Sequence, residues 1–206
     1  MSQHKQTPND VDRVLAFWFG AMTDGFCSTD TRRRWFASDP AFDRQIARQF
    51  GDMLKSAADG ALTHWLKDAR GRLAFIIVTD QFSRQIHRGL AAAFSTDLLA
   101  RNAAHEGIEL GHDRMLALDE RSFFYLPFEH SELPVDQDTS VALFTRLSQE
   151  MPREHRAVAD ETLRYARGHR DILIRFGRFP HRNACLGRAS TQAEQEFLRS
   201  ASRFGQ

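Results

Sequence analysis

The chain has 206 residues, of which 42% are apolar, and a net charge of +1 at pH 7. This length suits a single domain (residues 1–206), the apolar content excludes an intrinsically disordered protein, and the near-neutral charge gives no reason to expect nucleic acid or an anionic membrane surface as a partner. No apolar run approaches the roughly 20 residues of a transmembrane helix, and the two cysteines form neither a metal motif nor a disulfide framework. We therefore expect a soluble, cytoplasmic protein with a flexible polar tail at residues 1–9.

Apolar residues at helical spacing predict a succession of helices. The first spans residues 11–19 and ends at Gly20. The second begins at Asp39-Pro40, a capping side chain followed by proline in the first turn, and runs to about residue 60. Thr191 and Glu194 form a capping box that opens the last helix. Between these, further helices are predicted at residues 61–69, 73–88, 96–110, 119–126, 136–151 and 152–176.

Two residues within these helices carry more specific expectations. Pro127 is expected to end the aromatic helix 119–126, because proline in a helix interior removes a backbone hydrogen bond. Gly168 lies inside helix 152–176, where glycine costs roughly 1 kcal/mol relative to alanine, and this hints at a close backbone approach there.

The fold class that these patterns predict is all-α. No segment shows convincing strand alternation. Antiparallel helices joined by short loops, with no single heptad seam, favour stacked antiparallel helix pairs over a four-helix bundle. No sequence similarity recurs at a fixed period, so repeats are not visible as repeats.

The predicted helix 73–88 carries a stripe that changes character along its length. It is apolar at Leu73 and Ile77 and becomes polar at Gln81 and Arg84. Asp80 lies beside this polar part and forms an i,i+4 pair with Arg84. A buried stripe that becomes charged halfway along is either a structural ion pair or the wall of a pocket.

A loop near the end of the chain, residues 176–188, combines aromatic and cationic residues. Gly177, Pro180 and Gly187 interrupt any regular periodicity, so we expect an ordered loop. Its frequent aromatic residues indicate burial, and a buried loop needs a partner for every polar group. The polar residues that therefore require carboxylates, carbonyls or a bound anion are Arg178, His181, Arg182, Asn183 and Arg188.

Five motifs together resemble those of a known bacterial family. They lie at residues 14–20, 34–36, 80–84, 126–132 and 176–183, and the last two, Leu-Pro-Phe-Glu-His-Ser-Glu and Phe-Gly-Arg-Phe-Pro-His-Arg-Asn, are specific. Over about residues 11–198 the chain is similar to the family called domain of unknown function 924. The resemblance implies a tetratricopeptide-like right-handed superhelix of helix pairs, and it brings no established activity, cofactor or catalytic residue.

One departure from the family pattern is visible. The family usually has Pro and Asn where this chain has Ser83 and Gln85. Asp80, Gln81 and Arg84 of the same motif are kept, so the departure puts little in doubt.

The candidate binding residues share one property, because each interrupts an apolar pattern or lies in the buried loop. They are Asp80, Gln81, Arg84, His130, Glu132, His169, Arg178, His181, Arg182, Asn183 and Arg188, with Glu129 beside them. We expect them to converge in space. Their cationic and imidazole groups outnumber their carboxylates, so we expect the empty site to favour an anion.

Three interpretations of this set remain open. The first is an Arg/His-rich pocket for an anionic small molecule or a peptide carboxylate. The second is a metal-independent acid–base enzyme, a hydrolase or transferase acting on a phosphorylated or carboxylated substrate, with His130 or His181 as the base and Glu132 or Asp80 orienting it. The third is a protein-interaction module in which the charges form a purely structural network. No metal-ligand spacing and no cofactor motif is present, and the neighbouring arginines oppose a bound cation.

Overall fold

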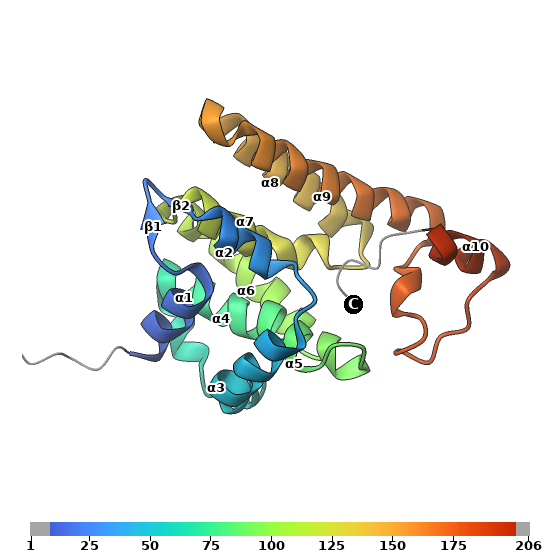
Figure 1. Cartoon of the computed structure of the whole chain (residues 1–206), viewed down its shortest axis with the longest axis horizontal. Helices are drawn as coiled ribbons and strands as arrows, with labels where there is room; N and C mark the ends of the chain where they lie inside the picture. The colour runs from blue at the N-terminus through green and yellow to red at the C-terminus, as the bar shows by residue number, and fades with distance from the viewer. Residues whose placement is uncertain (1–8, 201–206) are drawn as a thin grey trace, which may run out of the picture.

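The computed structural model of the protein describes residues 9–200, and helices dominate it (Figure 1). Its α-helices are α1 (Asp10–Phe19), α2 (Thr29–Trp35), α3 (Pro40–Ala58), α4 (Ala69–Ile76), α5 (Ser83–Ile86), α6 (Asp97–Glu109), α7 (Leu118–Glu129), α8 (Pro134–Glu150), α9 (Arg156–Phe176) and α10 (Gln192–Ser200). A π-helical turn, η2 (Ile77–Phe82), joins α4 to α5. Short 3-10 turns are η1 (Thr63–Lys67), η3 (Ala91–Phe94), η4 (His112–Met115), η5 (Arg153–His155) and η6 (Pro180–Arg182). The predicted all-α class is therefore confirmed, and its right-handed superhelical twist stays a prediction.

Several helix ends lie where the sequence predicts them, because the capping side chains form the expected hydrogen bonds. The Asp39 carboxylate accepts the backbone N–H of Ala41 at 2.8 Å and opens α3. Thr191 accepts from the N–H of Glu194 at 3.2 Å, and the Glu194 carboxylate accepts from the N–H of Thr191 at 2.7 Å. At the start of α1, the side chain of Asn9 caps the helix. The rest of the predicted tail, residues 1–8, lies outside the described residues.

The structure corrects several predictions about local structure. The predicted helix 61–69 is only the 3-10 turn η1, and α4 begins at Ala69. Pro127 lies inside α7, which continues to Glu129 instead of ending at residue 126. A two-stranded antiparallel hairpin, β1 (Met22–Thr23) with β2 (Phe26–Cys27), is present although no strand was predicted, because two residues per strand are too few to show alternation. Gly168 has open space around it, since a side chain added there would meet no atom within 4 Å. Its predicted close backbone approach is wrong.

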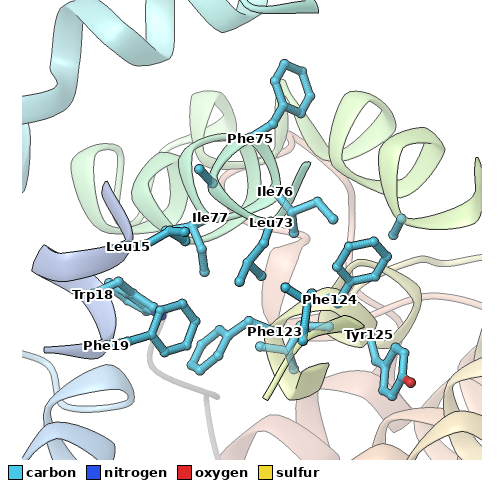
Figure 2. Packing of buried hydrophobic residues seen from close by; sticks show 14 of the residues in the cluster. Leu15, Trp18, Phe19, Leu73, Phe75, Ile76, Ile77, Phe123, Phe124 and Tyr125 are labelled. Carbon is cyan, nitrogen blue, oxygen red and sulfur yellow. The ribbon is translucent and has the colours of Figure 1, made fainter. Parts of the chain in front are cut away.

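One large hydrophobic cluster joins the two halves of the chain (Figure 2). Trp18 and Phe19 of α1 meet Phe123 of α7, with ring centroids 5.5 Å apart in both pairs. Leu73 and Ile77, from α4 and η2, are fully buried in the same cluster. This core fixes α7 against α1 and α4.

The antiparallel pair α8 and α9 lies along one side of α7, and α10 lies near the far end of α9 (Figure 1). The body formed by α1 and α3–α6 lies on the other side of α7. No helix of residues 9–200 is both long and apolar enough to cross a membrane.

Candidate functional site

A groove with a volume of about 720 Å³ runs along α7. One wall is formed by α2 and by the η2–α5 segment, and the opposite wall is formed by α8 and α9. Its lining residues are Thr29, Arg32, Arg33, Trp35, Phe36, Ala37, Gln81, Arg84, Gln85, Arg88, Asp119, Ser122, Leu126, Glu129, His130, Phe144, Leu147, Met151, Val158, Glu161, Thr162, Tyr165 and His169.

The groove is elongated and changes in polarity along its length. Asp119 and His130 line it at opposite ends of α7, eleven residues apart, which corresponds to roughly 16 Å at 1.5 Å per residue. The part between them is largely apolar, with side chains that include Leu126, Phe144 and Met151. The His130 end is polar and is formed by Gln81, Arg84, Glu129, His130 and His169.

The π-helical turn η2 brings Asp80 and Gln81 to this polar end. A π turn widens the helix by one residue and releases a backbone carbonyl from the regular pattern, and such turns occur frequently at functional sites. Here the Thr96 hydroxyl donates to the carbonyl oxygen of Thr79 at 2.5 Å. The Thr79 hydroxyl in turn donates to the carbonyl of Phe75 at 2.7 Å. These bonds hold the turn that carries Asp80.

Asp80 and His130 form a hydrogen-bonded pair behind the groove surface. The His130 Nδ1 lies 2.8 Å from Asp80 Oδ1, and Gln81 Nε2 donates to Asp80 Oδ2 at 2.6 Å. Burial alone would raise the pKa of Asp80, but Arg84, His130 and the hydrogen bond from Gln81 hold it well below its ordinary value. Because an ionised carboxylate only accepts, Nδ1 of His130 carries the hydrogen, and Nε2 at the other side of the ring carries the lone pair.

The imidazole of His130 is kept uncharged at neutral pH. Burial and the positive charge of Arg84 lower its pKa below the ordinary value, against the opposing effect of Asp80. His130 is therefore a hydrogen-bond acceptor at Nε2.

Glu129 and His169 form the second pair at the polar end. The His169 Nδ1 lies 3.1 Å from Glu129 Oε1 and 2.9 Å from the carbonyl oxygen of Tyr165. Burial, reinforced by the negative charge of Asp80, raises the pKa of Glu129 to about 8, and burial lowers the pKa of His169 to about 3. Both groups are uncharged at pH 7, so their contact lies between neutral groups and is not an ion pair.

Two arginines from distant segments share the carboxylate of Asp97. Arg84 binds it through both terminal nitrogens, at 2.8 and 3.1 Å, and Arg182 Nη1 lies 3.7 Å from it. The Arg182 guanidinium also stacks on the rings of Phe94 and Phe179, at 4.5 and 4.6 Å from their centroids. Burial and the charge of Arg84 lower the pKa of Arg182 to about 10.

The remaining candidates of loop 176–188 hold the loop in place. Arg188 donates to Glu132 through two bonds, at 2.7 and 3.0 Å, and its Nε donates to Asn183 Oδ1 at 3.0 Å. Glu132 accepts the backbone N–H of Phe179 at 2.7 Å as well. His181 lies beside the Phe179 ring, and burial and the charge of Arg182 lower its pKa to about 3.

Arg178 lies apart from the groove. It binds Glu194 of α10 at 2.6 and 2.9 Å and lines a separate hollow of about 400 Å³ beside that helix. The structure therefore brings Gln81, Arg84, His130 and His169 to the groove surface, with Asp80 directly behind them. Asp97 pairs with Arg84 and Arg182, and Glu194 pairs with Arg178. These two carboxylates were not among the predicted site residues, and they offset the excess positive charge that the arginines were expected to leave.

The match to known families is nearly as long as the chain. Residues 14–202 match a family described as bacterial protein of unknown function, DUF924. The chain belongs to this family. The membership confirms the resemblance that its five motifs indicate.

A solved structure has the same fold as this DUF924 protein. It is that of a protein of unknown function, ATU0120, from Agrobacterium tumefaciens, with a TM-score of 0.79 and 37% sequence identity. The likeness covers 93% of this chain and 97% of that one. No curated protein matches the sequence.

Sequence reasoning missed the apolar part of the groove in this DUF924 protein. Trp35 and Phe36 belong to a motif of the family, but nothing in their spacing shows that they face Met151 and Val158 across an open groove. Asp97 was also missed, because a carboxylate in the first turn of a helix normally serves the helix itself. Within residues 9–200, no three His, Cys, Asp or Glu side chains are grouped so as to hold a metal ion.

Proposed function

We propose that the groove binds an elongated, amphipathic small molecule that has an apolar body and a carboxylate or other carbonyl-containing head group. The observation that carries this proposal is the groove of about 720 Å³ whose polar end includes the buried side chains of Gln81, Arg84, Glu129 and His169. Its volume lies in the range of small-molecule sites, which are largely apolar and contain a few convergent polar groups.

The apolar body of the ligand would lie between α2 and the α8–α9 pair. Phe36 follows α2 and Tyr165 lies on α9; both line the groove, and they are 64% and 42% exposed. A ligand that covers them gains the free energy of removing apolar surface from water, about 25 cal/mol per Å².

The head group would be received by three donors at the polar end. Glu129 keeps its proton at neutral pH and donates through O–H. Gln81 uses one hydrogen of its amide on Asp80, which leaves the second for a ligand oxygen. Arg84 is the third donor. Its terminal nitrogens donate to Asp80 and Asp97, one terminal N–H remains, and the side chain lines the same end of the groove. The ligand would therefore have the anionic head group expected from the sequence. That head group would contact side chains of α7, η2 and α5, and not the arginines of loop 176–188.

Isothermal titration calorimetry with octanoate, 1-octanol and acetate tests the proposal. Octanoate has both an apolar body and a carboxylate, so we expect it to bind with a negative heat-capacity change. Acetate lacks the body and 1-octanol lacks the carbonyl oxygens, so both should bind at least about tenfold more weakly, as expected for the loss of about 1.4 kcal/mol.

A matched pair of variants on α9 locates the binding. Val158 is half-buried and lines the groove, so Val158→Trp places an indole in the path of the apolar body. Ile174 lies on the same helix, is 75% exposed and does not line the groove, so Ile174→Trp is the control. Octanoate binding should be lost in the first variant and kept in the second. Equal binding to both variants, or no binding to the wild-type protein, would contradict the proposal.

A further inference from the structure

We propose that the polar end of the groove is a proton-transfer site for a bound ketone. His130 is the general base that takes a proton from the carbon next to the carbonyl, and Glu129 is the general acid that protonates the carbonyl oxygen. The proposal rests on the proposed function, because the substrate is an amphipathic molecule held in the same groove. It adds a reaction class, enolisation, and a role for each side chain.

The base is positioned by Asp80. Asp80 Oδ1 accepts from Nδ1 of His130 at 2.8 Å, and Asp80 itself is held by Gln81 and Arg84. This arrangement fixes the ring and its tautomer, so that the lone pair of Nε2 is the free basic position of a residue that lines the groove. Asp80 is only 1% exposed, and it is a positioning residue because its contacts run through His130.

The acid is the neighbouring side chain on α7. Glu129 is the last residue of the helix, His130 follows it as the cap, and both side chains line the same end of the groove. His169 Nδ1 donates its hydrogen to the Tyr165 carbonyl at 2.9 Å and lies 3.1 Å from Glu129 Oε1. The protonated carboxyl of Glu129 has one O–H, which can donate to a ligand in the groove that this side chain lines.

The protonation states at neutral pH suit these roles. The pKa of Glu129 is raised to about 8 and that of His130 is lowered, so that a protonated carboxyl and an unprotonated imidazole lie side by side. Two titratable groups whose environments shift their pKa values in opposite directions are a recognised mark of acid–base sites. None of the described residues that line this end is a serine, threonine or cysteine, so its reactive groups are imidazoles and a carboxyl and not a hydroxyl or thiol.

Enolisation moves one proton from carbon to His130 and one proton from Glu129 to the carbonyl oxygen. His130 Nε2 takes the proton from the carbon next to the carbonyl, and the electron pair of that C–H bond forms the C=C bond of the enol. The carbonyl oxygen takes the proton of Glu129. The imidazolium is stabilised by Asp80, which accepts from its Nδ1 at 2.8 Å, and the opposite charges that form on His130 and Glu129 lie at the same end of the groove. In the reverse direction the enol O–H returns its proton to Glu129, and His130 returns a proton to carbon.

Deuterium incorporation into 2-octanone in D₂O at neutral pD tests the proposal. Its ketone accepts from Glu129, and the imidazolium of His130 exchanges its proton with solvent before returning a deuteron to carbon. We expect the protein to accelerate incorporation next to the carbonyl, measured by mass spectrometry, and His130→Gln to lower the rate by about 100-fold or more, the usual contribution of a general base. Glu129→Gln should lower it as well, and Asp80→Asn should shift the pH profile of the reaction.

Two comparisons keep the outcome decisive even if a variant folds poorly. Octanoate at saturating concentration should suppress the exchange catalysed by the wild-type protein, and Ile174→Trp should leave it unchanged. If 2-octanone binds by calorimetry but exchanges no faster than in buffer, the proton-transfer proposal is wrong while the binding proposal stands. If exchange is unaffected by octanoate or by His130→Gln, it takes place elsewhere and the proposal is also wrong.

Discussion

Asp80 and Glu129 are buried carboxyls at the same end of the groove, yet they differ in protonation state at neutral pH. Asp80 receives hydrogen bonds from His130 and Gln81 and lies beside Arg84, so it stays ionised. Glu129 has no arginine partner in the described part of the chain and lies near the negative charge of Asp80, so it keeps its proton. The difference follows from which side chains face each carboxyl, not from burial, which both share.

The free energy of unfolding should depend on pH through the carboxyl of Glu129. The pKa of Glu129 is about 8 in the folded protein, against an ordinary value of 4.5, so at pH 7 folding takes up a proton. Stability from this group is therefore complete below about pH 4.5 and is lost as the pH rises through 8. Between pH 7 and 8.5 we expect the free energy of unfolding to fall by about 1 kcal/mol, given 1.36 kcal/mol per pKa unit. Urea denaturation of the wild-type protein should show this fall, and Glu129→Gln should not.

The groups that face Glu129 do not obscure this measurement. They are Asp80 on η2, His169 on α9 and His130 at the end of α7, and the pKa of each lies below the range from 7 to 8.5. Parallel curves for the wild-type protein and Glu129→Gln over that range would show that Glu129 is already ionised at pH 7.

At the scale of the helices, the sequence predicted well what depends on neighbours along the chain. The caps at Asp39 and Thr191 act through side chains that bond backbone groups two or three residues away, and both formed as predicted. Pro127 was misjudged because local rules set its cost, while the packing of α7 in the core keeps the helix continuous past it. Tertiary packing can outweigh such a local preference.

For the site too, contacts between neighbours along the chain could be predicted from the sequence, and contacts between distant segments could not. The change from apolar to polar residues on helix 73–88 correctly indicated that Asp80 and Arg84 lie in direct contact. The partners of the loop arginines were not predictable, because Asp97 and Glu194 reach Arg84 and Arg178 only through the tertiary arrangement. The same holds for the groove, whose walls come from five separate segments of the chain.

Close packing of α6 against α7 supports a prediction at the scale of these two helices. A Cβ atom at Gly107 would lie 2.4 Å from both Arg72 Cδ and Phe124 Cζ. Phe124 is fully buried, and Arg72 is held by the carbonyls of Ala103 and Leu66, so neither can move aside easily. We expect Gly107→Ala to lower the free energy of unfolding by about 1–3 kcal/mol, the usual cost of overpacking.

Gly168→Ala on α9 is the matched control for this measurement. No atom lies within 4 Å of the added methyl group, so the higher helix propensity of alanine should stabilise the protein by up to about 1 kcal/mol. Thermal or urea denaturation of both variants decides the matter. A stabilising effect of Gly107→Ala would mean that α6 and α7 are packed less tightly than the structure shows.

In the whole molecule, α7 is the element that the two sides of the groove share. It packs against α4 and α6 on one side and against α8 on the other. The chain just before α2 contacts the chain between α8 and α9, where the ring of Phe26 in β2 stacks on that of His155 in η5, with centroids 3.7 Å apart. Along the groove itself, α2 and α9 face each other across the space that a ligand would fill.

Because the groove lies between two walls, a bound ligand should change the dynamics of both walls together. Of the residues of α2 only Trp35 is buried; its indole donates to the carbonyl of Trp18 at 2.9 Å, and Arg32 donates to Asp119 of α7 through two nitrogens at 3.0 Å. A short helix with so little buried surface is expected to open locally at low free-energy cost. A ligand that contacts both walls removes that opening.

In hydrogen–deuterium exchange at short labelling times, octanoate should therefore slow exchange in α2 and in residues 158–169 of α9 together. Helix α3, which contributes no lining residue, should be unchanged at those times, and Val158→Trp should abolish the response to octanoate. Protection confined to α9, with α2 unaffected, would show that the ligand does not span the groove and would remove α2 from the binding site.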